Sequence, residues 1–432
     1  MNAGRIVLAT GGSLGDLHPF IALGRALKAR GHEVGVATAV DYREKIEAAG
    51  LAFHQVGPSV ADLMHDTGMD LSALTEAIAK SDRFLFGEIL LPYAGAAARQ
   101  LIAVTEGAVA VVGSTLAIGA QMAAEHWRVP GVAVSLQPTM VFSRHDPPFL
   151  PAAPWLKPAT GGPQLWLNDL TRALGRMSTA RWTSPMNAVR ASVGLPPTTD
   201  NIIFDAGRSA DLSLGLYSPL LSPRQPDASA NFHVVGYAAY DSETGGPAAL
   251  SPEIEGFLNA GPPPLVFTLG SAAVHIPGDF YVESLKAARR LGRRAVLLVG
   301  PDGDLSVGGG GSDIHVARYA PFSLLFPRAA GVVHQGGVGT VQQALQGGRP
   351  QLVVPHLGDQ YDNAARVVRL GCGATLARGR YRGEAAARVL GGLLDDRTAL
   401  ARAEALAVTA RAEDGAGAAA DLIAGLIMRR TA

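Results

Sequence analysis

Two glycine-rich clusters, each placed directly after a short apolar run, carry the strongest chemical signals in the sequence. The later cluster, from His334 to Thr340, reads His-Gln-Gly-Gly-Val-Gly-Thr. Backbone N–H groups at a helix N-terminus bind anions readily, and glycines let a phosphate come close to the backbone. Thr340 adds a hydroxyl donor, and His334 can donate a hydrogen bond or carry a positive charge. The cluster favours a phosphate site over an empty turn, although it lacks the Gly-Lys-Ser/Thr of a Walker loop.

A second polar group follows the next apolar run. Asp359 and Gln360 stand side by side shortly after Pro355, and Asn363 comes one helical turn later. Adjacent parallel strands deliver their C-terminal ends to one crevice, so we expect this pair to lie near the phosphate cluster. An acid and an amide together can accept from and donate to neighbouring sugar hydroxyls. Helix capping by Asp359 is the structural alternative, but it does not explain Gln360.

The earlier glycine cluster offers two groups that could remove a proton. From Gly11 to Pro19 it reads Gly-Gly-Ser-Leu-Gly-Asp-Leu-His-Pro, which includes Asp16 and His18. An aspartate with its ordinary pKa of about 3.9 is a weak base at neutral pH unless burial raises that pKa. Histidine, with a pKa of about 6.5, is intrinsically better suited. A dinucleotide-binding alternative, with Asp41 as its acid, lacks the Gly-x-Gly spacing.

The elements around these clusters alternate in the manner of βαβ units. Apolar runs separated by helical patterns predict parallel sheets with right-handed crossovers in both halves of the chain. The expected strands cover 5–10, 33–38, 108–113, 131–135, 211–217, 265–269, 295–299, 314–317, 331–334 and 351–354. The expected helices include 19–30 and 42–49, and two or more lie within 396–429. This pattern predicts an α/β protein of two facing Rossmann-like domains with a cleft between them.

The domain boundaries follow from composition. Residues 222–252 are rich in Pro, Ser, Gly and Asp and form the expected linker between domains at 1–221 and 253–432. The last helices could pack back on the first domain. A proline-rich stretch over 138–163 has no periodicity, and a loop of this length is more often functional than decorative.

Bulk composition excludes several classes of protein. The chain has 432 residues with 37 basic and 37 acidic side chains, so no basic excess points to nucleic acid. The single cysteine, Cys372, cannot form an internal disulfide and suits a reducing compartment, so we expect a cytoplasmic protein. The first apolar run, 6–9, is too short for a signal peptide. The uncharged stretch 107–124 is expected to be a strand and a helix instead of an integral membrane span.

The segment from Val333 to Arg366 resembles the donor signature of the UDP-glycosyltransferase superfamily, which has the GT-B fold. In that family the histidine and the glycine-threonine turn hold the diphosphate, and the aspartate–glutamine pair holds the sugar. Gln335 departs from many relatives, which have a second histidine there. Thr268-Leu-Gly-Ser271 resembles a further turn whose serine reaches the diphosphate. The resemblance implies diphosphate binding by Gly270, Ser271, His334, Gly336, Gly337, Gly339 and Thr340, and sugar binding by Asp359 and Gln360.

Two further positions are implied by the same resemblance. The tryptophan on which plant members stack the base is absent, and Tyr319-Ala-Pro-Phe-Ser stands nearby, as in bacterial members that make rhamnolipids and glycosylated natural products. Phe322 and Ser323 are therefore the expected base-binding residues. In the N-terminal motif of the family the residue after the last glycine is the catalytic base. That residue is Asp16 here, with His18 expected to orient the acceptor or share the task.

The resemblance implies a metal-independent, inverting glycosyltransferase. Its donor would be a UDP- or dTDP-hexose, such as UDP-glucose or dTDP-rhamnose, and its acceptor a small, largely apolar aglycone or lipid. No cofactor and no metal are expected. Asp302 and Asp304 match the Asp-x-Asp metal motif of another fold, but they lie in a glycine-rich loop. Two alternatives remain open, a nucleotide-sugar epimerase of similar architecture and a non-catalytic relative that binds a nucleotide sugar.

Overall fold

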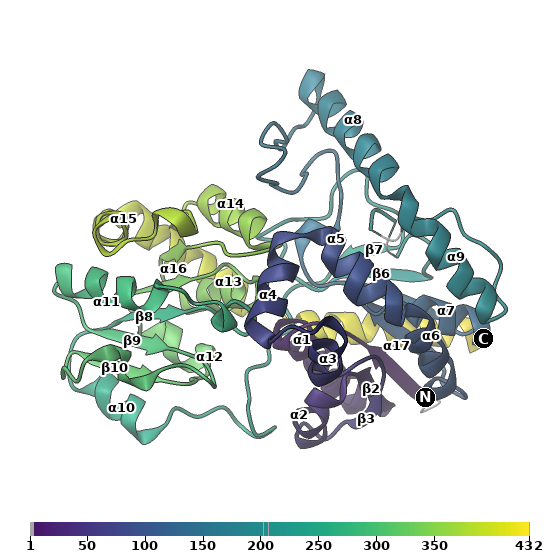
Figure 1. Ribbon diagram of the computed structural model, residues 1–432, viewed down its shortest axis with the longest axis horizontal. Coiled ribbons are helices and arrows are strands. Elements are labelled where there is room, and N and C mark those ends of the chain that lie inside the picture. Colours follow the sequence, from purple (N-terminus) through teal and green to yellow (C-terminus); the bar gives the residue numbers. More distant parts are fainter. Residues whose placement is uncertain (1–3, 202, 206, 432) are drawn as a thin grey trace. The chain divides into compact units, whose positions relative to one another are not determined.

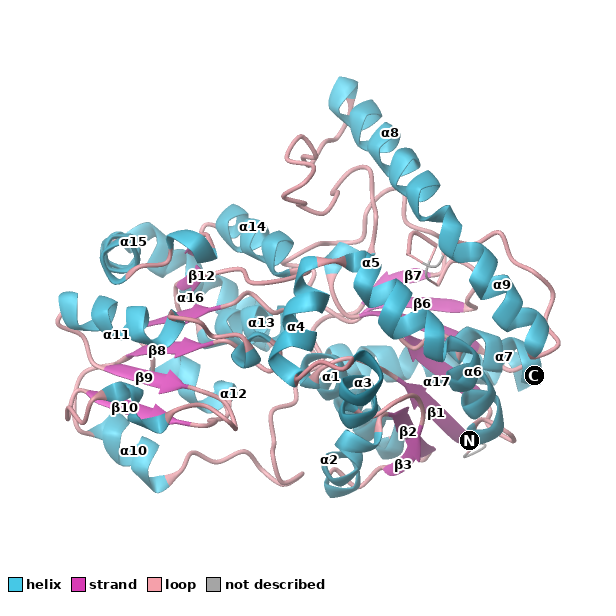
Figure 2. Ribbon diagram, viewed as in Figure 1, coloured by secondary structure: helices cyan, strands magenta, loops and turns pink. Residues whose placement is uncertain are grey.

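The fold is α/β and consists of two compact units, each built on its own parallel sheet (Figures 1 and 2). It is known from a computed structural model that describes residues 4–201, 203–205 and 207–431. The first unit runs to residue 240 and adds 244–246 and the segment from 414 onward, and the second comprises 241–243 and 247–413. The α/β architecture with Rossmann-like sheets, expected from the sequence, is confirmed.

The sheet of the first unit has the strand order β3-β2-β1-β4-β5-β6-β7, and all neighbours are parallel. One face is covered by α1 (Leu14–Ala29) and α17 (Gly415–Thr431), and the other by α6 (Leu91–Val104) and α7 (Ala120–Trp127). The strands are β1 (Arg5–Ala9), β2 (Glu33–Thr38), β3 (Ala52–Gln55), β4 (Ala110–Ser114), β5 (Gly131–Ser135), β6 (Leu212–Gly215) and β7 (Phe232–Val234).

The sheet of the second unit has the order β10-β9-β8-β11-β12-β13, also parallel throughout. Its faces are covered by α11 (Phe280–Arg290) and α15 (Gly383–Asp395) on one side and by α10 (Pro252–Asn259), α12 (Phe322–Leu325) and α13 (Val338–Gly347) on the other. The strands are β8 (Leu265–Thr268), β9 (Ala295–Leu298), β10 (Ile314–Ala317), β11 (Gly331–His334), β12 (Gln351–Val353) and β13 (Gly373–Thr375). Helix α14 (Gln360–Leu370) follows β12, and α16 (Arg397–Arg411) follows α15.

The first helix begins earlier than the sequence predicts. The expected start at Pro19 is wrong, because α1 begins at Leu14 and includes Pro19 in its second turn. Ser13 and Asp16 form a reciprocal capping box that satisfies backbone donors of the first turn. This cap gives the helix a start that the proline does not interrupt, since proline is tolerated near a helix N-terminus.

Three edge strands, β3, β7 and β13, were not expected. Each has only three or four residues, and polar side chains such as His54 and His233 interrupt their apolar pattern. Edge strands are half solvated, so a continuous apolar run is not required there. Because β7 lies within 222–252 and buries Phe232, that segment is not a linker throughout. The chain instead crosses between the units near residues 240–247 and returns at residue 414.

The uncharged stretch 107–124 forms β4 and the beginning of α7, as expected. Among the described residues, no helix has both the length and the apolar character needed to cross a bilayer.

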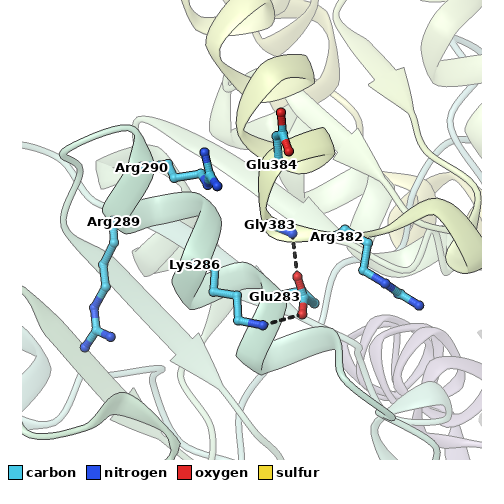
Figure 3. Close-up of a pocket in the computed structure, with 7 residues that line it drawn as sticks. All are labelled: Glu283, Lys286, Arg289, Arg290, Arg382, Gly383 and Glu384. Atoms are coloured by element: carbon cyan, nitrogen blue, oxygen red, sulfur yellow. Dashed lines mark hydrogen bonds and ion pairs between the residues drawn. The ribbon is translucent and has the colours of Figure 1, made fainter.

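Helices α11 and α15 pack side by side, and a buried carboxylate joins them (Figure 3). Glu283 accepts a hydrogen bond from Lys286 Nζ at 2.7 Å and another from the N–H of Gly383, the first residue of α15. These bonds lower the pKa of Glu283, with the Lys286 contact as the largest cause. Arg289, Arg290, Arg382 and Glu384 line the same hollow, whose volume is about 500 Å³. Glu283 thus satisfies one of the orphan N–H groups of α15.

Replacing Glu283 by alanine should lower the free energy of unfolding by about 1–3 kcal/mol, because a buried helix-end N–H loses its acceptor. Glu384→Ala is the matched control, since among the described residues Glu384 pairs only with Arg388, at the exposed surface, and its loss should cost less than about 1 kcal/mol. Urea unfolding of both variants measures the difference. Equal losses would show that the Glu283 contact does not hold α15 in place.

Candidate active site

The sequence-predicted donor residues of the second unit follow three adjacent strands. Strands β8, β11 and β12 are neighbours in the sheet, and the register aligns His334 with Thr268 on one side and with Val353 on the other. Gly270 and Ser271 follow β8, the glycine cluster follows β11, and Asp359 and Gln360 follow β12. The carboxyl edge of this sheet therefore brings all three predicted segments together.

Helix α13 presents an N-terminus with no side-chain cap. Gly337 is its N-cap residue, and the first intrahelical bond runs from the N–H of Val341 to the carbonyl of Gly337. The N–H groups of Val338, Gly339 and Thr340 precede that bond and point out of the helix end. Free N–H groups and the positive end of a helix dipole are the features by which helix N-termini bind anions.

Gly336 has a conformation that only glycine adopts without strain. Its φ is +95°, and a Cβ there would lie 2.6 Å from Cγ1 of Val353 on β12. The turn is therefore pressed against the next strand, which places the N-terminus of α13 close to the loop after β12.

The His334 side chain supports this turn by a hydrogen bond and carries no positive charge. Its Nδ1 accepts the N–H of Gly336 at 3.0 Å, so the proton is on Nε2, which lies 3.0 Å from Oε1 of Gln351. The side chain is fully buried, and burial lowers its pKa to about 4. The cationic role that the sequence allowed for His334 is wrong. Its ring fixes the shape of the Gly336 turn.

Asn363 connects the glycine turn to the acidic pair. Its Nδ2 donates to the carbonyl of Gly336 at 2.9 Å and to Oδ2 of Asp359 at 2.7 Å, and its side chain is fully buried. Asp359 occupies the N-cap position of α14, but its side chain does not cap the helix backbone. The capping alternative for Asp359 is therefore wrong. The signal for Asn363 was its spacing of four residues from Asp359.

Gln360 uses one half of its amide inside the protein. Its Oε1 accepts from the N–H groups of His356 and Leu357 at 2.8 and 3.1 Å. The side chain is buried, and no residue in the described parts of the chain accepts from its Nε2. The amide is thus fixed in orientation, with two N–H hydrogens left to donate to a ligand.

The expected base-binding residues lie at the start of α12. Phe322 is half-buried and stacks on Phe326 at a centroid distance of 4.5 Å. The N–H of Ser323 donates to Oδ2 of Asp241 at 2.9 Å, and the hydroxyl of Tyr319 donates to the Asp241 carbonyl. Asp241, which the sequence analysis did not single out, thus anchors both ends of the predicted segment.

In the first unit, Asp16 lies in the first turn of α1 as part of the capping box. Its Oδ2 accepts from the N–H of Ser13 at 2.8 Å, and Oδ1 has no donor among the described residues. Desolvation raises the pKa of Asp16 to about 6, although the bonds to Ser13 oppose the shift. One carboxylate oxygen therefore holds the turn, and the other can accept a proton near neutral pH.

His18 is the weaker base of the two in this structure. Burial and, to a smaller extent, the charge of Lys45 lower its pKa to about 3. Its ring lies edge-on to Tyr240 at a centroid distance of 5.4 Å, and its buried Nε2 has no partner among the residues described. The order of basicity expected from unperturbed pKa values is reversed.

A row of hydroxyl side chains beside Asp16 was missed by the sequence analysis. Thr10, Thr38 and Ser114 stand at the carboxyl ends of three adjacent strands, at the same level in the sheet register. Thr10 Oγ1 donates to the carbonyl of Asp16, and the buried hydroxyls of Thr38 and Ser114 have no partner in the described part of the chain. Their signal was a hydroxyl residue at the end of two predicted strands and directly after the end of the third.

Comparison with known proteins places this architecture in a family. The glycosyltransferase family 28 N-terminal domain matches residues 6–141, and the erythromycin biosynthesis protein CIII-like C-terminal domain matches residues 306–421. The vancomycin aglycone glucosyltransferase of Amycolatopsis orientalis is 32% identical over 98% of this chain and 98% of its own. The O-mycaminosyltylonolide 6-deoxyallosyltransferase of Streptomyces fradiae is 31% identical over 97% and 96%. The chain belongs to the bacterial natural-product glycosyltransferases.

The resemblance to GT-B glycosyltransferases is confirmed by structure as well. The solved structure of glycosyltransferase VinC in complex with dTDP aligns with a TM-score of 0.66 over 98% of this chain and all of its own, at 18% identity. This likeness shows the shared fold.

One acid of each alternative motif, Asp304 and Asp41, has a hydrogen-bond partner within this glycosyltransferase. Asp304 Oδ1 accepts from the N–H of Ser306 at 2.8 Å and caps a short 3₁₀ helix over Leu305–Gly308. Asp41 Oδ2 accepts from the N–H of Val60 at 3.1 Å. Both side chains are thus explained by the local backbone.

The carboxyl group of Asp16 should titrate with a midpoint of about 6 in a ¹³C NMR experiment, with Asp16→Asn to assign its resonance. Because the folded pKa lies above the unfolded value of about 3.9, Asp16 stabilises the fold most at low pH, and this contribution is lost as the pH rises through 6. As the pH rises from about 4 to about 6, Asp16→Asn should therefore gain stability relative to the native chain. A midpoint near 4 would contradict the desolvation of this carboxyl group.

Proposed function

We propose that this glycosyltransferase moves a hexose, glucose or rhamnose, from a UDP- or dTDP-sugar to a hydroxyl group of a small, largely apolar acceptor, a natural-product aglycone or lipid. Transfer inverts the anomeric centre and needs no metal. The observation that carries the proposal is the uncapped N-terminus of α13, joined through Asn363 to Asp359 and Gln360. The name of the vancomycin relative, which is an aglycone glucosyltransferase, and the dTDP complex of VinC support it.

The second unit provides the groups that hold the donor and stabilise its departure. As the bond to the anomeric carbon breaks, negative charge grows on the nucleoside diphosphate. The N–H groups in the first turn of α13 and the positive end of its dipole stabilise that charge. Neutral His334 supports the turn that aims these groups. Asp359 accepts from, and Gln360 Nε2 donates to, hydroxyls of the sugar.

The first unit provides the base. The free Oδ1 of Asp16 takes the proton from the acceptor hydroxyl, whose oxygen attacks the anomeric carbon on the side opposite the diphosphate. A carboxylate with a pKa of about 6 is ionised at neutral pH and still basic enough to share the proton in the transition state. His18, which is neutral and hydrogen-bond competent at Nε2, orients the acceptor.

The first test is donor binding without metal. Calorimetry with UDP and with dTDP in excess chelator should show binding of at least one of them, and a thermal-shift panel of nucleotide sugars should then identify the donor for acceptor screening. Loss of all binding in chelator would contradict the metal-free site and would favour metal binding by Asp302 and Asp304. Conversion of the donor sugar without any acceptor would instead indicate an epimerase.

The second test separates Asp16 from His18. Asp16→Asn keeps the size and the bond to Ser13 but cannot take a proton, so kcat should fall by about 10²-fold or more while nucleotide affinity stays near that of the native enzyme. The acidic limb of the native pH profile should break near pH 6 and should disappear in this variant. His18→Ala should cost less, mainly in the KM for the acceptor. Normal turnover in Asp16→Asn together with an inactive His18→Ala would transfer the role of base to the histidine.

A further inference from the structure

The amide of Gln335 fills the space between the two glycine turns of the donor unit. A Cβ at Gly270 would lie 2.2 Å from Nε2 of Gln335, and a Cβ at Gly337 would lie 2.7 Å from the same atom. Any larger residue at either position would displace this side chain. The Gln335 amide therefore occupies the side of Gly270 on which a side chain would stand.

The protein does not hold this amide by hydrogen bonds. Gln335 is only 4% exposed, yet its Oε1 is buried with no partner among the described residues. Leaving a buried amide oxygen unpaired destabilises the free protein. The two glycines leave room for the amide but offer its polar atoms no hydrogen bond. The stability of the fold therefore does not explain why a polar side chain is buried here.

The position of the amide suggests that explanation. Gln335 directly precedes Gly336 and Gly337, and Gly337 is the N-cap residue of α13. The amide thus stands at the entrance of the anion site, beside the first turn of N–H groups. Because Oε1 has no fixed donor, no protein bond opposes an orientation in which the amide N–H groups face an anion.

We propose that the Gln335 side chain is a diphosphate-binding group, whose Nε2 donates a hydrogen bond to a phosphate oxygen of the donor alongside the N–H groups of α13. This inference rests on the proposed donor site. It gives a phosphate contact to a neutral side chain to which the sequence analysis assigned no role. The same amide spans the turns after β8 and β11, so it also keeps the two phosphate-binding loops at a fixed spacing.

The experiment compares three variants by calorimetry with the nucleoside diphosphate that binds the native protein best and with its nucleoside. Gln335→Glu keeps the shape of the side chain but replaces the donor by a negative charge, and Gln335→Met keeps the length without any polar atom. Gln343→Glu is the matched control, since Gln343 lies in α13, is 8% exposed and has an equally unpartnered Oε1. Thermal unfolding of each ligand-free variant reports the effect on folding.

We expect diphosphate affinity to fall about fivefold in Gln335→Met, as for one lost hydrogen bond, and at least about tenfold further in Gln335→Glu. Affinity for the nucleoside should stay within about threefold in both, and Gln343→Glu should bind the diphosphate like the native protein. Native-like diphosphate affinity in Gln335→Met would overturn the proposal even if Gln335→Glu does not fold. Parallel losses for nucleoside and diphosphate would also overturn it, because they would indicate a purely structural role. Absence of diphosphate binding by the native protein would instead refute the proposed function.

Discussion

The proposed donor site depends on one buried amide, that of Asn363. Its two hydrogens bind the Gly336 carbonyl and the Asp359 carboxylate, so a single side chain sets the distance between the Gly336 turn and the Asp359–Gln360 pair. A diphosphate and its sugar are joined by one bond, and the groups that recognise them must keep a matching separation to act on the same molecule. Asn363 lies inside α14 and is fully buried, so its position is set by the packing of a helix and not by a loop.

The sequence predicted the parts of this site that depend on local rules. Strands β8, β11 and β12 are short apolar runs followed by glycine or proline, and their parallel order places Gly270, Gly336 and Asp359 at one edge of the sheet. The sequence could not predict which polar atoms of the site would form hydrogen bonds within the protein. His334 can be cationic or neutral in any isolated turn. Only its burial beside Gln351 and the Gly336 N–H decides that it is neutral.

The sequence was equally unable to rank Asp16 and His18 of the first unit as bases. From ordinary pKa values His18 is the better base at neutral pH, yet desolvation moves the two groups in opposite directions, Asp16 upward to about 6 and His18 downward to about 3. Burial disfavours whichever form is charged, so it strengthens a carboxylate as a base and weakens an imidazole. Desolvation arises from tertiary packing, and the early start of α1 at Leu14 contributes by placing both residues within the helix. Neither fact can be read from spacing alone.

Glycine illustrates why a correct motif does not settle a mechanism. Gly336 and Gly270 both have a positive φ, and a Cβ at Gly336 would meet Val353, whereas a Cβ at Gly270 or Gly337 would meet the amide of Gln335. Three glycines that look alike in a phosphate-binding pattern are thus constrained by different neighbours. In the proposed site, the free N–H groups that follow them and the Gln335 amide face the anion. The site is therefore best described as an uncapped helix end held in place by neutral side chains, His334, Gln335 and Asn363. Neutral supports suit a site whose ligand gains negative charge during the reaction, because fixed dipoles can stabilise that charge without first binding a counter-ion of their own.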